Sequence, residues 1–587
     1  MTAITVALCQ FRPEKGDRTA NLARVEEYFA GFAAPSVAPD LVIFPEAILT
    51  GYFLEGGVRD HAVSAETLHR ELVECHARSG APPMEVCLGF YELWRDHLHN
   101  SALWSGLGGP DSGIRHVHRK IFLPTYGVFD EERFVEAGTE VRAFDTPLGR
   151  AAVLVCEDAW HSITPMIAAL DGAQFIAIVA ASPARGIAPD PLHPGQPQSL
   201  ARWERLLRDI AGEHGVYAAL AQLVGFEGGK AFPGGSLLAS PGGDIIARAP
   251  LFDEALVSQV IDLGEIARIR AASPLLADLQ QRLPHLIDSL QRERGQAPPV
   301  VSRRSNPSGL RAPAPTPMLE IDPELTRRWL VDFIRDEVQR DRGFSKVVIG
   351  LSGGVDSAVS AWLAAEALGP GNVIAVRMPY RTSHPDSLAH ARLVTEAVGI
   401  TEHTIDISAA VDGYAASSTE PPTPSRLGNV MARVRMLALF DTGASANALP
   451  LGTGNKSERL LGYFTWHADD APPVNPLGDL FKTQVWELAR HLGVPAAIVD
   501  KPASADLIAG QTDEGDFGIS YARADAILDL VLHGHRDDAI ADAGYLETEI
   551  GIVRTRLDST HWKRSLPSVA MLSQTAIGEY YLRPLDY

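Results

Sequence analysis

The residues best suited to chemistry are Ser352 to Ser357, the sequence SGGVDS. They follow an apolar run, Val347 to Ile349, whose β-branched residues predict a buried strand, and they precede a predicted helix, AVSAWLAAEAL. A glycine loop between a strand and a helix directs backbone N–H groups and the positive end of the helix dipole at an anion. Because the P-loop spacing GxxxxGK[ST] is absent, the motif predicts a phosphate-binding loop of another type.

A second set of candidates lies in the first half of the chain. Glu46 ends the segment LVIFPE, Lys120 lies in HRKIFLPTYGVFDE, and Cys156 follows the apolar run AAVLV. Taken singly, each has an ordinary explanation. A cysteine that ends an apolar strand is most often an inert core residue, and a charged residue there is most often solvated. Only their occurrence together indicates a catalytic site.

Together and in this order, the three motifs resemble those of the nitrilase, or carbon–nitrogen hydrolase, superfamily over roughly residues 2–262. The resemblance implies amide hydrolysis, with Cys156 as nucleophile and Glu46 as general base. Lys120 would stabilise the thiolate and the oxyanion. Glu132 resembles the supporting second glutamate of many members, but an ordinary helix-surface residue is an equally good interpretation.

The glutaminase members of this superfamily imply a set of residues that hold the amide substrate, glutamine. In this sequence the set comprises Tyr126, Glu157 and Ser182. The family usually has a lysine several residues after that serine, whereas Arg185 is the only base nearby here. Glutamine is therefore a less direct expectation than amide hydrolysis itself.

Small polar residues follow another apolar segment in the second half, LPLGTGNKSERL. Thr453 is suited to nucleotide contact at the end of a strand. The carboxylates of Glu458 and of Asp356 in the glycine loop are oxygen ligands, which Mg²⁺ prefers. Mg²⁺ bound there would neutralise phosphate charge during adenylyl transfer.

SGGVDS resembles the pyrophosphate-binding loop of the ATP pyrophosphatases, and with GTGNKSE it resembles the NAD synthetase family. RLGNVMARVRM, NPLGDLFKTQVWELARHLGVP, KPASADLIAGQTDE and THWKRSLP follow in the same order, over about residues 317–567. This family adenylates the nicotinate carboxylate of deamido-NAD with ATP, and ammonia then displaces AMP to give NAD. The resemblance implies ATP binding by Gly350, Leu351, Ser352, Gly353, Gly354, Val355, Asp356, Ser357, Thr453, Lys482 and Ser504, and deamido-NAD binding by Asn429, Glu458 and Lys563.

One segment departs from that family. Its members carry a GYFTKYGDGA-like sequence, whereas residues 462–471 read GYFTWHADDA. The lysine and the two later glycines of the family sequence are absent here. Contacts to the dinucleotide are therefore open at this segment. Trp466 and Trp562 are expected in the core. The stretch 501–514, KPASADLIAGQTDE, is expected to form a lid.

The elements that must position these motifs follow from apolar periodicity. Short apolar runs alternate with helical stretches in both halves, and Val485, Leu488 and Leu492 have the spacing of a buried helix face. The fold class is α/β, and the resemblances imply an α-β-β-α nitrilase-like sandwich followed by a Rossmann-like parallel sheet. A Pro-rich stretch near residues 295–318 predicts a linker, preceded by a mostly helical stretch from 252 to 294. We expect domains at residues 1–265, 266–316 (bridge and linker) and 317–587.

Composition limits the class of protein. The 587 residues exceed one ordinary core, and the formal net charge of −21 argues against nucleic-acid or anionic-membrane binding. The four cysteines have no CxxC pairing, and no apolar run is long enough to span a membrane. We expect a cytoplasmic protein, and the family resemblance implies a homo-oligomer.

The favoured hypothesis is a glutamine-hydrolysing enzyme of the NAD synthetase family. A second hypothesis keeps both folds but gives the ligase another acceptor. A third makes the first half a scaffold while free ammonia feeds the synthetase. An intact set of Glu46, Lys120 and Cys156 argues against the third.

Overall fold

The computed structural model describes residues 3–34, 38–54, 57–293, 313–383, 385–504, 511–565 and 570. Within them the chain forms two units, residues 3–186 with 196–293, and residues 187–195 with 313–565, and each is described by itself. Most of the predicted linker lies outside the described residues.

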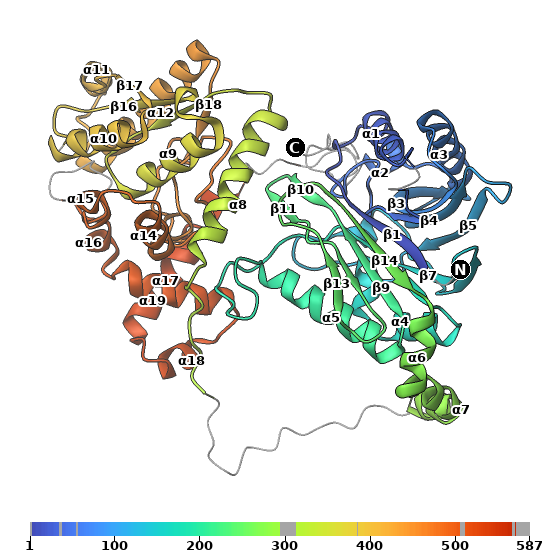
Figure 1. Cartoon of the computed structure of the whole chain (residues 1–587). Coiled ribbons are helices and arrows are strands. Elements are labelled where there is room, and N and C mark those ends of the chain that lie inside the picture. The colour runs from blue at the N-terminus through green and yellow to red at the C-terminus, as the bar shows by residue number, and fades with distance from the viewer. Residues whose placement is uncertain are drawn as a thin grey trace, which may run out of the picture. The chain divides into compact units, whose positions relative to one another are not determined.

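The first unit is built from two sheets and the helices that cover them (Figure 1). Its strands are β1 (Ala3–Gln10), β2 (Leu41–Ile43), β3 (Met84–Trp94), β4 (His97–Leu107), β5 (Gly113–Arg119), β6 (Ala143–Thr146), β7 (Gly149–Val155), β8 (Phe175–Ala180), β9 (Tyr217–Gln222), β10 (Val224–Glu227), β11 (Lys230–Pro233), β12 (Leu237–Ala239), β13 (Ile245–Arg248) and β14 (Ala255–Asp262). Its helices are α1 (Arg18–Gly31), α2 (Val58–His61), α3 (Ala65–Ser79), α4 (Ile163–Leu170), α5 (Gln198–His214), α6 (Gly264–Ala272) and α7 (Leu275–Glu293), with 3₁₀ turns η2 (Glu131–Arg133) and η3 (Cys156–Trp160).

The two large sheets each contain six strands, ordered β14-β1-β2-β3-β4-β5 and β13-β12-β9-β8-β7-β6. Strands β1, β2 and β3 are parallel, as are β7, β8 and β9, and the flanking strands are antiparallel. The sheets face each other through β1 and β9 and through β4 and β7, around one apolar core. Helices α1 and α3 cover the first sheet, and α4 and α5 the second. The predicted α-β-β-α sandwich is confirmed.

One strand of this unit was not predicted. Residues 252–294 are mostly helical, as expected, through α6 and α7, but β14 occupies Ala255–Asp262 before those helices begin. Its side chains alternate between intermediate and exposed positions, which is the period of two of a strand. Antiparallel pairing with β1, far away in sequence, fixes the strand.

The second unit has one four-stranded sheet with helices on both faces (Figure 1). Its strands are β15 (Val347–Gly350), β16 (Val373–Arg377), β17 (Thr401–Thr404) and β18 (Leu449–Leu451). Its helices are α8 (Pro323–Arg335), α9 (Val355–Leu368), α10 (Pro385–Val398), α11 (Ser408–Ser417), α12 (Pro424–Ala446), α13 (Lys456–Leu460), α14 (Lys482–His491), α15 (Ala496–Val499), α16 (Asp513–Phe517), α17 (Tyr521–Leu532), α18 (Asp537–Asp542) and α19 (Glu547–Ser559), with short turns η4 (Asp336–Arg340), η5 (Pro370–Asn372) and η6 (His561–Arg564).

The strand order β17-β16-β15-β18 is parallel throughout, so the predicted Rossmann-like sheet is confirmed. Helices α8, α9 and α14 pack into the core on one face, and α12 packs on Val348 of the other. Val485 and Leu488 of α14 are fully buried, as their spacing predicted. Because β16 and β18 lie on opposite sides of β15, the loops after β15 and β18 diverge and leave a crevice, the usual ligand site of such sheets.

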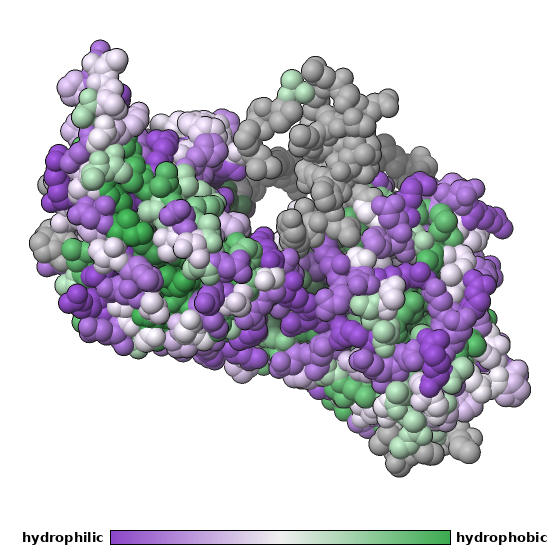
Figure 2. Space-filling view, turned by 90° about the horizontal axis from the view of Figure 1, so that it is seen from above, coloured by the Kyte–Doolittle hydropathy of each residue, from purple (hydrophilic) through white to green (hydrophobic). Residues whose placement is uncertain are grey.

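Figure 2 shows hydrophilic residues over most of the visible face, with apolar residues gathered in smaller patches. Among the described residues, no helix combines the length and apolar character needed to cross a membrane.

Candidate active sites

Three predicted residues of the first unit lie at the ends of strands. Glu46 follows β2, Lys120 follows β5, and Cys156 begins the η3 turn directly after β7. Cys156 has a φ of 44°, in the left-handed region that a residue with a Cβ seldom adopts. The strand β7 and the turn thus force the backbone at Cys156 into a sharp change of direction.

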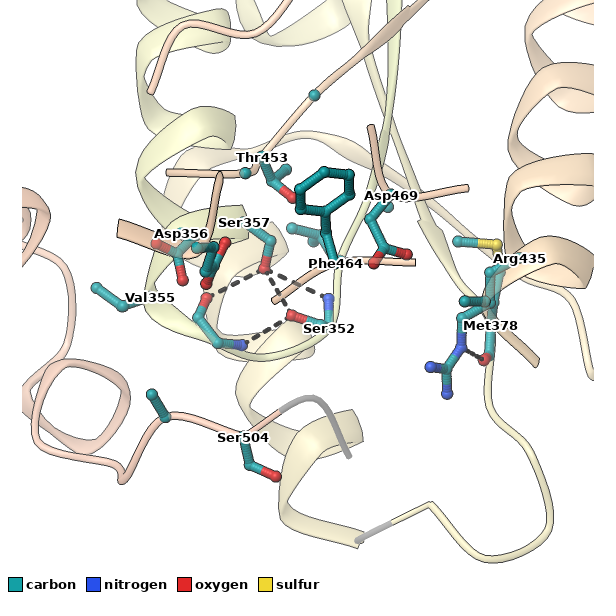
Figure 3. A pocket seen from close by; sticks show the side chains of 18 of the residues that line it. Ser352, Val355, Asp356, Ser357, Met378, Arg435, Thr453, Phe464, Asp469 and Ser504 are labelled. Carbon is teal, nitrogen blue, oxygen red and sulfur yellow. Dashed lines mark hydrogen bonds between the residues drawn. The ribbon is translucent and has the colours of Figure 1, made fainter. Parts of the chain in front are cut away.

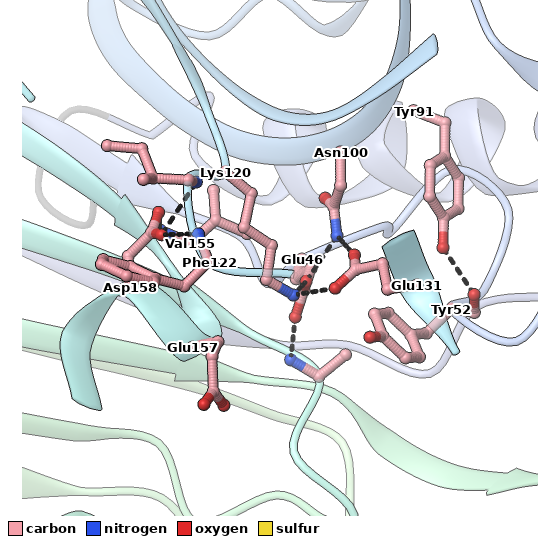
Figure 4. A network of polar contacts seen from close by, with 12 residues as sticks. Glu46, Tyr52, Tyr91, Asn100, Lys120, Phe122, Glu131, Val155, Glu157 and Asp158 are labelled. Atoms are coloured by element: carbon pink, nitrogen blue, oxygen red, sulfur yellow. Dashed lines mark hydrogen bonds and ion pairs between the residues drawn. The ribbon is translucent and has the colours of Figure 1, made fainter. Parts of the chain in front are cut away.

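Lys120 lies between two carboxylates, and all three side chains are buried (Figure 4). Its Nζ is 3.0 Å from Oε1 of Glu46 and 2.6 Å from Oε2 of Glu131. Asn100 donates to both carboxylates, at 2.7 Å to Glu46 and 2.5 Å to Glu131. The other oxygen of Glu46 accepts the N–H of Ala181 at 2.7 Å. Every oxygen of Glu46 is therefore held by a donor.

The charges of this cluster determine which of its side chains carry a proton. Burial alone would lower the pKa of Lys120, but Glu131 and Glu46 outweigh burial and hold it well above its usual value. Burial, and then the charge of Glu46, raise the pKa of the Cys156 thiol well above its usual value, although Lys120 acts in the opposite direction. The lysine is a permanent cation, and the resting cysteine is a thiol that needs a base.

Of the two interpretations of Glu132, the structure supports the surface residue. Glu131, not Glu132, contacts Lys120 and Asn100, and Glu132 is exposed. The η2 turn decides between the two neighbours, because it points the side chain of Glu131 inward. Sequence reasoning missed Asn100, which lies within β4 and has no local signal of its own.

The predicted glutamine-binding residues are only partly brought together. The Tyr126 hydroxyl donates to the Glu157 carboxylate at 3.0 and 3.1 Å, and Tyr126 is exposed at 59%. Ser182 follows the β8 strand end, and its hydroxyl accepts the indole N–H of Trp203 at 2.8 Å. Glu157 follows Cys156 directly, so the Tyr126–Glu157 pair lies next to the predicted nucleophile.

A cavity of about 340 Å³ lies at the crevice of the second sheet (Figure 3). Every residue predicted to bind ATP lines it except Gly353, and Glu458 lines it as well. Hydrogen bonds inside the loop fix its shape: the hydroxyls of Ser352 and Ser357 are 3.2 Å apart, and Gly354 N–H donates to Ser352. Helix α9 begins within this loop, so the positive end of the helix dipole favours an anion in the cavity.

Gly353 allows the loop to pack closely against the backbone of Ser387. Its φ is +75°, and a Cβ there would lie 2.3 Å from the carbonyl oxygen of Ser387. Only glycine fits this position without moving backbone.

The cavity also contains opposed charges. Lys482 Nζ donates to Oδ2 of Asp356 and lies 3.7 Å from Oε1 of Glu458, while Asn455 donates to the other oxygen of Asp356 at 2.9 Å. Burial, and then the charge of Asp356, raise the pKa of Glu458 to about 8. Two carboxylates that disfavour each other's charge form an oxygen donor set that suits a hard dication such as Mg²⁺.

A buried carboxylate on α17, missed by sequence reasoning, organises this charged cluster. Asp525 accepts the Ser457 hydroxyl at 2.5 Å and both the N–H and the hydroxyl of Thr483, at 3.0 and 2.9 Å. It thereby joins α13, which carries Glu458, to the start of α14, which carries Lys482.

Both units are similar to known proteins. Residues 5–271 match the family model described as carbon–nitrogen hydrolase, and residues 326–567 match that described as NAD synthase. The NH(3)-dependent NAD(+) synthetase of Trichlorobacter lovleyi is 46% identical over 270 residues, which are 46% of this chain and 98% of that protein.

The chain belongs to the NAD synthase family.

A second relative in the NAD synthase family, the NH(3)-dependent NAD(+) synthetase of Chlorobaculum tepidum, is 47% identical over 263 residues (44% of this chain, 94% of that protein). Among solved structures, the glutamine-dependent NAD+ synthetase of Acinetobacter baumannii in complex with ADP covers 98% of this chain and 97% of its own, with a TM-score of 0.69 and 24% identity. At that identity the likeness shows a shared fold. The resemblances predicted for both halves are confirmed.

Two residues predicted to bind deamido-NAD do not line the cavity of this NAD synthase family member. Lys563 Nζ donates to the carbonyl oxygens of Gly462 and Phe464, at 2.8 and 2.6 Å, and Asn429 accepts the hydroxyl of Thr465 at 3.0 Å. Both side chains hold the segment that departs from the family pattern. Phe464 of that segment lines the cavity.

Trp562 was expected in the core and is not there. It is 50% exposed and packs edge-on against Trp466, with ring centroids 5.3 Å apart. The predicted lid lies partly outside the described residues, which stop at Ser504 and resume at Gln511.

Proposed function

We propose that this protein is a glutamine-hydrolysing NAD synthetase, a ligase that forms a C–N bond. One observation carries the proposal: a buried Glu46–Lys120–Cys156 site and a second half 46% identical to ammonia-dependent NAD synthetases share one chain. The first unit would supply the ammonia that the second consumes. We keep the domain division at 1–265, 266–316 and 317–587 as part of the proposal.

The amidase steps follow from the charges of the first unit. Glu46 takes the thiol proton of Cys156 as the sulfur attacks the amide carbon of glutamine. The Lys120 ammonium stabilises the oxyanion, and Glu131 keeps that ammonium charged and in place. Glu46 then returns the proton to the nitrogen as the C–N bond breaks and ammonia leaves. Water, deprotonated by Glu46, hydrolyses the thioester to glutamate.

We assign glutamine recognition to Tyr126, Glu157 and Ser182. The carboxylate of Glu157, adjacent to the nucleophile, suits the α-ammonium group of the amino acid. Tyr126 already donates to that carboxylate and would orient it.

The synthetase steps belong to the second unit. The loop 352–357 and the α9 N-terminus would bind the phosphates of ATP, with Lys482 beside them. The nicotinate carboxylate of deamido-NAD attacks the α-phosphorus and pyrophosphate leaves. Ammonia then attacks the carbonyl carbon of the adenylate, and AMP leaves to give NAD. Mg²⁺, held by Asp356 and Glu458, would neutralise phosphate charge. We assign deamido-NAD to Glu458 directly, and to Asn429 and Lys563 through the segment they hold.

A second candidate function has one observation in its favour. The curated relatives described above are named as NH(3)-dependent and match only the second half. In that case the first unit would be a scaffold. We favour the glutamine-dependent function, together with a cytoplasmic homo-oligomer.

The proposal is tested by measuring NAD formation from deamido-NAD, ATP and Mg²⁺ with either glutamine or ammonium chloride. Product with both nitrogen sources supports it. Product with ammonia alone favours the scaffold or another amide donor, and no product with either means that the acceptor differs.

A further inference from the structure

A fully buried carboxylate lies two residues after the nucleophile and takes no part in the steps above. Asp158, on the η3 turn, accepts four hydrogen bonds; Figure 4 shows its carboxylate together with Val155 and Phe122. Oδ1 accepts the backbone N–H groups of Ile121 at 2.9 Å and Phe122 at 3.0 Å, and Oδ2 accepts Val155 N–H at 3.2 Å and His118 Nε2 at 2.8 Å.

The backbone donors flank Cys156 and Lys120, at the end of β7 and just after the end of β5. Val155 directly precedes Cys156, whereas Ile121 directly follows Lys120. One carboxylate therefore connects the backbone that carries the nucleophile to the backbone that carries the cation. A shift of either segment would change the separation of sulfur and ammonium.

The turn needs such a restraint, because Cys156 holds a left-handed φ of 44°. The bond from Val155 N–H to the Asp158 side chain closes this turn over Cys156. The Asp158 carbonyl in turn accepts the hydroxyl of Thr164 at 2.5 Å, which anchors the far end of the turn to α4.

His118 completes the arrangement from β5. Its ring is buried, and its Nδ1 has no hydrogen-bond partner among the described residues. That favours the tautomer with the proton on Nε2, which donates to Asp158. Although burial acts in the opposite direction, His118 and the backbone N–H groups hold the pKa of Asp158 below its usual value, so the carboxylate is ionised and can accept all four bonds.

We propose that Asp158, supported by His118, is a positioning residue for amide hydrolysis, which fixes Lys120 and Cys156 relative to each other. This inference rests on the amidase part of the proposed function. Asp158 acts through the backbone of its neighbours and touches no substrate.

The first test replaces the carboxylate. Asp158→Asn turns two of the accepted bonds toward an NH₂ group, which cannot accept them. We expect kcat for glutamine hydrolysis to fall about 100-fold, as for a small misplacement of reacting groups, with KM nearly unchanged. Ammonia-driven NAD synthesis, in the other unit, serves as the internal standard. The matched control is Glu85→Gln, because Glu85 is also buried and paired, with Trp104 and Arg115, outside the site.

The second test keeps the aspartate and changes its partner. In His118→Gln the amide nitrogen can replace Nε2 as donor, whereas His118→Leu offers none. We expect the glutamine variant to retain most of kcat and the leucine variant to lose about tenfold. This pair decides the matter if Asp158→Asn fails to fold.

Alkylation of Cys156 by iodoacetamide, followed by peptide mass spectrometry, gives a readout independent of the substrate. We expect its rate to change in Asp158→Asn and His118→Leu but not in Glu85→Gln. Equal kcat and alkylation rates in Asp158→Asn and Glu85→Gln, or in the two His118 variants, would overturn the inference. If the wild type hydrolyses no glutamine, the proposed function fails, and the alkylation rates still decide the role of Asp158.

Discussion

Lys120 shows how much one buried charge controls at the scale of the residue. Removing a single partner from a buried ion pair costs far more than the pair contributes, because it leaves a charge without compensation. Lys120 neutralises both Glu46 and Glu131, so its loss would leave two carboxylates facing each other in the core. Catalysis and stability should therefore depend on the same atom.

We predict that Lys120→Met lowers glutamine hydrolysis by about 100-fold or more. It should also lower the free energy of unfolding by about 3–5 kcal/mol. The loss of stability should be larger at pH 8 than at pH 6, because burial raises the pKa of Glu131 and the variant lacks the lysine that opposes this rise, so Glu131 can take up a proton at the lower pH. Urea unfolding at both pH values measures this, with the exposed Lys346→Met as control. Hydrolysis within tenfold of the wild type would contradict the role of Lys120.

Glu458 provides a pH-dependent prediction at the same scale. Burial and the charge of Asp356 raise its pKa from 4.5 to about 8, so the folded state keeps a proton that the unfolded state loses above pH 4.5. The free energy of unfolding should fall as the pH rises from 4.5 toward 8.

Binding of Mg²⁺ with ATP should expel that proton. Calorimetry at pH 7 in two buffers of different ionisation enthalpy should show net proton release, and Glu458→Gln should abolish it. Removing Mg²⁺ with EDTA should also abolish the release. Equal release in the wild type and the variant would rule out Glu458 as the titrating ligand.

At the scale of the element, loops after strand ends build both sites. The loops after β15 and β18 both line the crevice at the end of these neighbouring strands. Gly350 and Leu451, about a hundred residues apart in sequence, therefore line one cavity. The glycine at the centre of the first loop is required by space as well as by backbone angle.

We predict that Gly353→Ala weakens ATP binding at least about tenfold, because the new Cβ must displace Ser387 and with it the loop. Gly369→Ala is the matched control. Gly369 also has a positive φ, of +86°, but a Cβ there meets no atom within 4 Å. Both variants carry the backbone strain, so only the loss specific to Gly353 reports on the loop. Equal KM values for ATP in the two variants would show that the contact is irrelevant.

Prediction from the sequence succeeded where the candidate site residues come directly after a buried strand. An apolar β-branched run gives the strand, and small or charged residues directly after it give the site, as with Glu46, Cys156 and the 352–357 loop. Prediction failed where long-range pairing or local orientation decides. β14 is fixed by β1, and Glu131 is distinguished from Glu132 only by a 3₁₀ turn. Nothing in the sequence indicated that Lys563, besides its predicted role, donates to the backbone carbonyls of Gly462 and Phe464.

At the scale of the whole molecule, the proposal joins two chemistries that need each other. Ammonia is mostly ammonium near neutral pH and is then not nucleophilic, so release inside the protein would preserve the reactive form. The account therefore requires that the first unit supply nitrogen to the second, and that the second work without the first when ammonia is abundant.

The most direct measurement compares Cys156→Ala with the wild type in NAD synthesis from deamido-NAD, ATP and Mg²⁺. The account predicts that the variant loses glutamine-driven synthesis and keeps ammonia-driven synthesis at the wild-type rate. Glutamine-driven synthesis that survives the substitution would contradict it, because nitrogen would then reach NAD without the cysteine.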